Sequence, residues 1–199
     1  MIEQLGNIVV IGLKAREDRW LRCKEIFETI GVKQVTHYST VQNFADPHRN
    51  YMKDFTQMLR VRGRISNNLV FFEDDFELCE GWEDVLRKAW NDLPADFDML
   101  YLGCNLTRPP LKITDNLYRV MGAWLMHATI LSKKFVQYVI EKYDYNAIWI
   151  IDDWYRLMAP QKKFYMTYPF ISYQRSDYSD MVGQYIFYDI FNNKFYKNL

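Results

Sequence analysis

The fold of this chain is decided by the stretch Asn68-Leu69-Val70-Phe71-Phe72-Glu73-Asp74-Asp75, a short apolar run that ends in three adjacent carboxylates. A run of four large apolar residues is typical of a strand that is buried on both faces. In open α/β sheets, ligands bind outside the carboxyl ends of the strands. The stretch therefore predicts a buried strand that delivers Glu73, Asp74 and Asp75 to a site at the edge of the sheet.

The density of acidic side chains at this point indicates a cation. Glu77 and Glu80 follow the three carboxylates closely, and such crowding either raises their pKa values or requires a positive ion, most simply a hard divalent one. In a continued strand, Glu73 and Asp75 would project to the same side about 6 to 7 Å apart, with Asp74 on the other side. The alternative is a solvated turn, but the apolar strand before it favours a site.

The surrounding sequence alternates strand and helix patterns, as in βαβ proteins. Gly31 and Gly63 mark helix ends, and Pro94 closes a helical region. The patterns predict strands at 8–11, 35–38, 69–72 and 98–103, and helices around 20–30, 52–59 and 82–90.

The second half predicts one more strand and two more helices. The strand covers 122–131, and a helix follows with Ser132 as its N-cap. An apolar run at 148–151 leads into Asp152 and Asp153, which open the other helix. Acidic residues favour the first turn of a helix through its dipole, so a purely capping role for this pair stays open beside a functional one.

Length and composition predict one compact domain over residues 1–199, and the alternation of strand and helix patterns predicts an α/β fold with a central, mostly parallel sheet flanked by helices. The chain is 49% apolar and 17% aromatic, which excludes disorder. Lysine plus arginine equals aspartate plus glutamate at 25 each, so net charge gives no reason to expect binding to nucleic acid or to an anionic membrane. The sharpest local basic group is Arg60, Arg62 and Arg64, for which solvated side chains are the alternative.

The cysteine and histidine pattern favours a reducing compartment. Cys23, Cys79 and Cys104 are an odd number without paired spacing, and no histidine pair has the spacing of a zinc site. The sequence has neither a leader pattern at its N-terminus nor an apolar stretch long enough to span a membrane. A cytoplasmic protein is expected.

Read in order, these segments resemble glycosyltransferase family 25, the lipopolysaccharide and collagen galactosyltransferase type. Each motif alone is weak, and their common order carries the resemblance. The matching segments are Ile8-Val9-Val10-Ile11-Gly12-Leu13-Lys14 with Arg16 and Arg19, Phe71-Phe72-Glu73-Asp74-Asp75, Phe97-Asp98-Met99-Leu100-Tyr101-Leu102-Gly103, residues 122–133, Ile151-Asp152-Asp153, and Tyr168-Pro169-Phe170 with Gln174, Ser176, Ser179 and Asp180.

The resemblance implies a GT-A nucleotide-sugar fold, related to the Rossmann fold. It divides the domain into a nucleotide-sugar-binding half at 1–105 and an acceptor and catalytic half at 106–199. The chain departs from the family at Thr56 and Gln57, where the family usually has a Ser-His pair, so details of donor and acceptor binding stay open.

On this resemblance, a divalent ion, Mn²⁺ or Mg²⁺, neutralises the diphosphate leaving group. Asp75 is the expected ligand, and Asp74 is able to share the ion. Glu73 or Asp74 is then expected to bind the ribose or base. Arg16 and Arg19 suit contacts to the diphosphate or base, with a salt bridge at the start of a helix as the alternative.

The family inverts the anomeric carbon, which requires a base that takes the proton of the acceptor hydroxyl. Asp152 or Asp153 is the expected base. Gln174 and Asp180 are expected to line the nucleotide or acceptor side. Trp124, Trp149 and Trp154 are candidates for stacking on a sugar, although tryptophan at helical spacing is more often part of the core.

The expected activity is transfer of a hexose, galactose or glucose, from a UDP-linked donor to a lipopolysaccharide or another surface glycan. A protein hydroxyl and a hydroxylated DNA base are alternative acceptors, the latter through the Arg60, Arg62 and Arg64 group. A noncatalytic nucleotide-sugar-binding protein and a nucleotidyltransferase are the other classes that the sequence leaves open.

Overall fold

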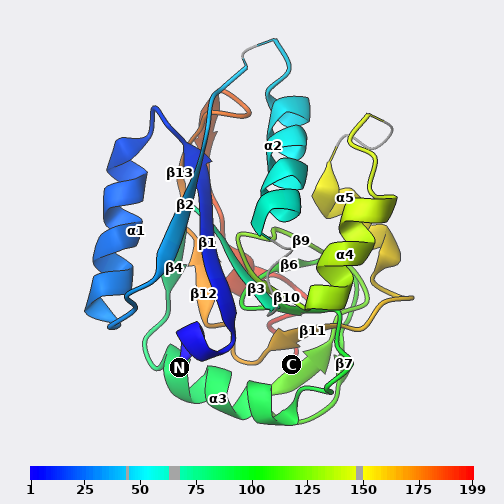
Figure 1. Ribbon diagram of the computed structural model, residues 1–199. Helices are drawn as coiled ribbons and strands as arrows, with labels where there is room; N and C mark the ends of the chain where they lie inside the picture. The colour runs from blue at the N-terminus through cyan, green and yellow to red at the C-terminus, as the bar shows by residue number, and fades with distance from the viewer. Residues whose placement is uncertain (44, 63–67, 147–149) are drawn as a thin grey trace.

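The computed structural model describes residues 1–43, 45–62, 68–146 and 150–199 (Figure 1). In this part of the chain, the main element is an eight-stranded sheet. Its strands lie in the order β2 (Val35–Thr40), β1 (Gly6–Leu13), β3 (Asn68–Glu73), β10 (Ala128–Leu131), β5 (Met99–Tyr101), β11 (Phe164–Thr167), β8 (Leu117–Arg119) and β7 (Leu111–Lys112).

Most strands of this sheet share one direction. β2 and β3 both pair with β1 in parallel, and β11 pairs with β5 in parallel. β10 lies between β3 and β5 and is antiparallel to both. The predicted α/β class with a mostly parallel central sheet is therefore confirmed, whereas the GT-A assignment stays a prediction.

Within the described ranges, three short ribbons and two 3₁₀ helices lie outside the main sheet. β4 (Phe76–Leu78) pairs with β12 (Ser172–Gln174), β6 (Asn105–Leu106) with β9 (Ala123–Trp124), and β13 (Asp177–Ser179) with β14 (Gln184–Ile186). The 3₁₀ helices are η1 (Ile2–Gln4) and η2 (Ile190–Asn192).

Helices cover both faces of the sheet (Figure 1). α1 (Glu17–Thr29) and α3 (Trp82–Asp92) pack on one face, while α2 (Pro47–Arg62), α4 (Lys133–Lys142) and α5 (Ile151–Met158) pack on the other. β3 alternates between the two cores, because Leu69 and Phe71 join the α2 side and Val70 and Phe72 join the α1 side. This explains why the strand that precedes the acidic motif is continuously apolar.

The chain order creates a switch point between β1 and β3. From β1 the chain passes through α1 to β2 on one side of the sheet, and the next strand, β3, pairs with the opposite side of β1. The connections that follow the two strands thus diverge and leave a crevice outside their carboxyl ends, which is where open α/β sheets bind ligands.

The single strand predicted at 122–131 is wrong. The structure divides it into β9 and β10, because Leu125 adopts a left-handed backbone with φ 67° that turns the chain. The backbone N–H of Leu125 donates a hydrogen bond to Asp152 Oδ2 at 3.1 Å, so the turn is tied to the first turn of α5.

Two further expectations have different outcomes in the structure. β3 ends at Glu73, so Asp74 and Asp75 lie in a turn rather than in a continued strand. Ser132 caps α4 as predicted, since its Oγ accepts a hydrogen bond from the Phe135 N–H at 3.3 Å. No helix among the described residues is both long and apolar enough to cross a membrane.

Gly103, which follows β5, allows the chain to approach the start of β12 closely. A Cβ at this position would overlap the carbonyl oxygen of Ser172, a backbone atom. Gly122 is also crowded, but a Cβ there would meet the side chains of Thr107, at 2.7 Å, and Arg108.

We expect Gly103→Ala to lower the free energy of unfolding by about 3 kcal/mol, because backbone must move to admit the methyl group. Gly122→Ala is the matched control and should lower the free energy of unfolding clearly less, since the side chains of Thr107 and Arg108 are able to rotate away. Chemical denaturation of both variants checks this, and equal losses would contradict the close approach.

Candidate functional site

A pocket of about 250 Å³ opens at the switch point. The carboxyl ends of β1, β2 and β3 form its base, and α2, the start of α5 and the β13–β14 hairpin form its walls. The described lining includes more acidic than basic side chains: Arg19, Glu73, Asp74, Asp75, Asp152 and Asp180. This excess of carboxylates in a confined space favours a bound cation.

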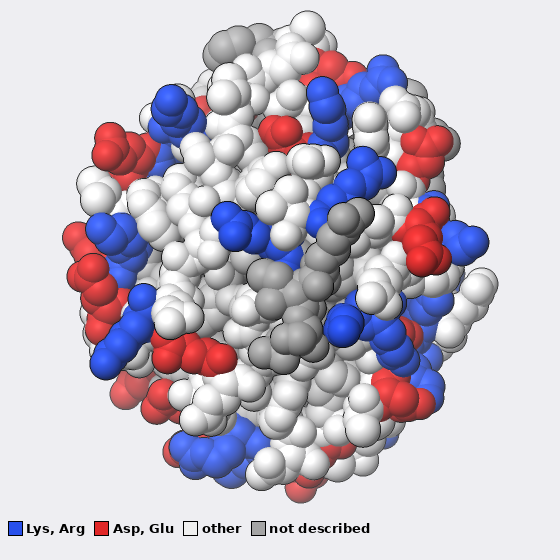
Figure 2. Space-filling model, in the orientation of Figure 1, with Lys and Arg blue, Asp and Glu red and all other residues white. Residues whose placement is uncertain are grey.

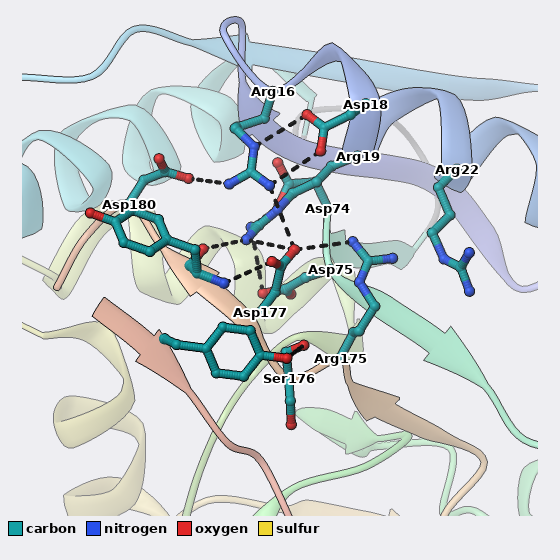
Figure 3. A network of polar contacts seen from close by, with 12 residues as sticks. Arg16, Asp18, Arg19, Arg22, Asp74, Asp75, Arg175, Ser176, Asp177 and Asp180 are labelled. Atoms are coloured by element: carbon teal, nitrogen blue, oxygen red, sulfur yellow. Dashed lines mark hydrogen bonds and ion pairs between the residues drawn. The ribbon is translucent and has the colours of Figure 1, made fainter. Parts of the chain in front are cut away.

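Arg19 is buried at the base of the pocket and is engaged with carboxylates (Figure 3). Its Nη1 lies 3.1 Å from Asp74 Oδ1 and 3.7 Å from Asp75 Oδ2, and its Nη2 lies 3.3 Å from Asp177 Oδ2. Nη2 also donates a hydrogen bond to the carbonyl of Tyr178 at 2.7 Å. Arg19 thus joins α1 to the end of β3 and to β13.

Asp74 is held on the Arg19 side of the acidic motif. It lies so close to Gly12 that a Cβ on this glycine would come within 2.5 Å of Asp74 Oδ2. Burial and the neighbouring Asp75 raise the pKa of Asp74 to about 6, against the opposing effect of Arg19. Asp74, in the turn that follows β3, therefore pairs with the guanidinium of Arg19.

Arg16 lies beside Arg19 in Figure 3 but is not among the residues that line the pocket. Its side chain contacts Asp18 at 3.2 Å, Asp180 at 2.6 Å and Asp177 at 3.5 Å. Both arginines that the sequence indicated are thus brought together, and carboxylates occupy both guanidinium groups.

Asp75 presents an unpaired oxygen. Gln174 Nε2 donates a hydrogen bond to Asp75 Oδ2 at 2.9 Å, whereas Asp75 Oδ1 is buried and has no hydrogen-bond partner among the described residues. The same holds for Gln174 Oε1. Burial raises the pKa of Asp75. A buried carboxylate oxygen without a donor is costly, so this position calls for a cation or a ligand donor.

Glu73 is fixed by a tyrosine from α2. The Tyr51 hydroxyl donates to Glu73 Oε1 at 2.5 Å. Burial raises the pKa of Glu73, and the nearby carboxylates of Asp75 and Asp152 raise it further. Three acids from β3, the following turn and α5 therefore interact across one pocket.

The described residues contain no group of three His, Cys, Asp or Glu side chains arranged to hold a metal by themselves. A divalent cation with substrate phosphates needs less, because Mg²⁺ usually binds through one or two carboxylates and keeps phosphate or water oxygens as its other ligands. The unpaired Asp75 Oδ1, beside the acidic lining, fits an ion that is shared with a phosphorylated ligand.

The structure separates the two candidate bases at the start of α5. Asp152 lines the pocket, and burial raises its pKa to about 6. Asp153 lies outside the lining, with 43% of its side chain exposed, and its Oδ1 accepts hydrogen bonds from Trp124 Nε1 at 3.1 Å and Arg156 Nε at 3.0 Å.

Several lining residues went unnoticed in the sequence. Tyr51 follows the apolar spacing of α2 and stacks on Phe55 with ring centroids 6.4 Å apart, so it resembles a core residue. Gln42 follows β2 and Asn50 lies in the first turn of α2, and neither belongs to a recognisable motif. Tyr188 lies near the C-terminus, in a segment without hydrophobic periodicity. The two amides follow a parallel strand, which is the signal that was available.

The other candidates are dispersed. Trp154 packs against Tyr138 and Tyr143, with centroids 6.1 and 5.1 Å away, and belongs to the core. Arg60 is exposed on α2, while Arg64 and Trp149 lie outside the described residues. Figure 2 shows basic and acidic side chains interspersed on the face in view.

Comparisons with known proteins add little. No family model and no curated protein matches the chain. Among solved structures, the chain is similar to apo UDP-glucose pyrophosphorylase, with 8% identity and a TM-score of 0.44, over 80% of this chain and 72% of that chain. A likeness of this size assigns neither a ligand nor a reaction.

The pKa of Asp152 predicts a pH-dependent cost in stability. The carboxyl group of Asp152 binds its proton more tightly in the folded state than in the unfolded chain. Ionisation of Asp152 therefore lowers the free energy of unfolding as pH rises from about 4 to about 6. Asp152→Asn removes this cost. We expect the variant to be more stable than wild type by about 1 to 2 kcal/mol at neutral pH, with the gain absent below about pH 4.

Denaturation of metal-free protein at the two pH values measures the gain. Asp153→Asn is the matched control and should change stability by less than about 1 kcal/mol, because exposed ion pairs contribute little. A gain for Asp152→Asn that is the same at both pH values would contradict the assigned burial.

Proposed function

We propose that this protein is a metal-dependent glycosyltransferase that uses a nucleotide sugar. One observation carries the proposal: at the switch point, the unpaired Asp75 Oδ1 and the half-buried Asp152 share a pocket lined by an excess of carboxylates. The resemblance of the sequence to glycosyltransferase family 25, with its GT-A fold, supports the same activity. The donor is a UDP-linked galactose or glucose, and the acceptor is a hydroxyl of a lipopolysaccharide or another surface glycan.

In this proposal Asp75 holds Mn²⁺ or Mg²⁺ through Oδ1, and Gln174 orients the carboxylate from its other oxygen. The ion, when bound, supplies the positive charge that stabilises the diphosphate leaving group. Asp74 is a weaker candidate for sharing the ion, because its carboxylate already faces Arg19.

Glu73 accepts hydrogen bonds from hydroxyls of the donor, and the Tyr51 hydroxyl fixes its orientation. Arg16 and Arg19 hold the β13–β14 hairpin against the pocket through Asp177 and Asp180. A direct contact of either arginine with a diphosphate requires one of these ion pairs to open.

Asp152 acts as the general base. Its carboxylate faces the pocket, and the Leu125 N–H donates to Oδ2 and fixes its orientation. With a pKa of about 6, it is ionised at neutral pH and able to take the proton of an acceptor hydroxyl as the anomeric carbon inverts.

Release of nucleoside diphosphate from a panel of UDP- and GDP-sugars, with CMP release scored for CMP-sugars, tests the activity. We expect manganese-dependent release that Asp75→Asn lowers at least about a hundredfold, because the ion contributes several kcal/mol to stabilisation of the leaving group. Asp18→Asn, which removes an exposed acid that contacts Arg16, is the control and should keep most of the activity.

The product distinguishes the remaining classes. Pyrophosphate in place of nucleoside diphosphate would identify a nucleotidyltransferase, and donor binding without turnover in the presence of glycan acceptors would identify a noncatalytic binder. Transfer to a hydroxylated DNA base, with salt-sensitive DNA binding, would move the acceptor to nucleic acid.

For the base, we expect Asp152→Asn to lower turnover about 10²- to 10⁴-fold while the KM for the donor changes little, since proton transfer is lost and donor contacts remain. The wild-type rate should rise with pH through about 6. At saturating acceptor, Asp153→Asn should keep both the turnover and its pH profile. If Asp153→Asn is the slower variant, the base is assigned to the wrong acid.

A further inference from the structure

Trp124 is held in a fixed orientation beside the pocket. Its Nε1 donates to Asp153 Oδ1 at 3.1 Å, and the Arg156 guanidinium lies 5.6 Å from the ring centroid. Arg156 Nε in turn donates to the same Asp153 oxygen at 3.0 Å. Despite these contacts, 43% of Trp124 remains exposed to solvent, so part of its apolar surface is accessible to a ligand.

The ring lies next to the proposed base. Two consecutive residues of one strand end, Trp124 and Leu125, contact two consecutive acids of α5, Asp153 and Asp152. Leu125 and Asp152 line the pocket, whereas Trp124 and Asp153 lie just outside its lining. The Trp124 ring therefore lies beside the part of the pocket that Asp152 lines.

The chemistry of this cluster suits a sugar ring. One face of a pyranose is a sheet of C–H bonds that packs on a flat indole, and the hydroxyls at its rim need both acceptors and donors. Asp153 provides an acceptor at the Nε1 edge of Trp124, and Arg156, whose guanidinium lies over the ring, provides donors. A nucleic acid needs unpaired cations for its phosphates, whereas Arg156 is already paired with Asp153 at 3.0 Å.

From this geometry we propose that Trp124, Asp153 and Arg156 form a saccharide-binding subsite that holds the sugar ring next to the reacting hydroxyl of the acceptor. The assignment to the acceptor rests on the proposed function, whereas binding of a saccharide at Trp124 does not. Asp153 thus acts as a binding residue, distinct from Asp152 as the base.

Fluorine NMR of protein labelled with 5-fluorotryptophan tests the subsite directly. The chain has 6 tryptophans, and Trp124→Phe assigns the resonance of Trp124 by its disappearance. We expect this resonance to shift saturably with methyl β-galactoside or methyl β-glucoside at millimolar concentration, and not with glycerol. The resonance of Trp20, which stacks on His37 at 4.3 Å, should not move and serves as the internal control.

Absence of a shift with every methyl glycoside tested would overturn the proposal. So would a shift caused by a single-stranded oligonucleotide but not by the glycosides, which would identify a nucleic-acid surface instead.

A kinetic measurement connects the subsite to the acceptor. Trp124→Ala should raise the KM for the glycoside acceptor about tenfold while the KM for the donor stays unchanged, which corresponds to loss of one aromatic contact. Trp20→Phe should change neither value. If Trp124→Ala leaves the KM for the acceptor unchanged, the subsite does not bind the acceptor. If the resonance shifts but no donor is turned over, the saccharide subsite stands and the proposed transferase activity fails.

Discussion

The buried guanidinium of Arg19 holds together three parts of the chain that are far apart in sequence. It links α1 to Asp74 and Asp75 after β3, and to Asp177 and the Tyr178 carbonyl in β13. Removing one partner of a buried ion pair costs about 3 to 5 kcal/mol, because the other charge is left without compensation. This contact, together with the ion pairs of Arg16, holds the C-terminal hairpin in place as one wall of the pocket. The guanidinium contacts Asp74 at 3.1 Å and only one oxygen of Asp75, at 3.7 Å, so the acidic groups of Glu73, Asp75 and Asp152 still act on one another, and this imbalance points to a cation.

The secondary structure that could be predicted from the sequence is the part with strong local patterns. The apolar run at Leu69–Phe72 was predictable as a strand, because a strand buried on both faces is apolar throughout, and its residues do alternate between two cores. Gly31 was predictable as the end of a helix, because glycine readily adopts a positive φ, which is 73° here. The break at Leu125 could not be predicted, since a leucine with a left-handed backbone is held by a distant acid, Asp152. The place of β10 between β3 and β5 likewise depends on pairing between strands far apart in the chain, for which local periodicity carries no information.

The candidate site was likewise predictable from the sequence only where a local pattern marks it. The three carboxylates after β3 were predictable as a motif, and the structure brings them together with Arg19, Gln174, Asp180 and Asp152 in one pocket. Asp152 and Asp153 were indistinguishable in the sequence, because both fit the first turn of a helix. Their positions differ, with only Asp152 lining the pocket, because a step of one residue along a helix rotates the side chain by about 100°. Tyr51 was missed for a related reason, since its spacing is that of a core residue while its hydroxyl reaches Glu73.

We propose that the acidic pocket binds a divalent cation together with a nucleoside diphosphate. Electron paramagnetic resonance of Mn²⁺, titrated with protein in the presence and absence of UDP, tests this. We expect UDP to strengthen Mn²⁺ binding to wild type, and Asp75→Asn to weaken this binding more than about tenfold while Asp18→Asn leaves it unchanged. Equal Mn²⁺ binding by wild type and Asp75→Asn, or no effect of UDP, would contradict it.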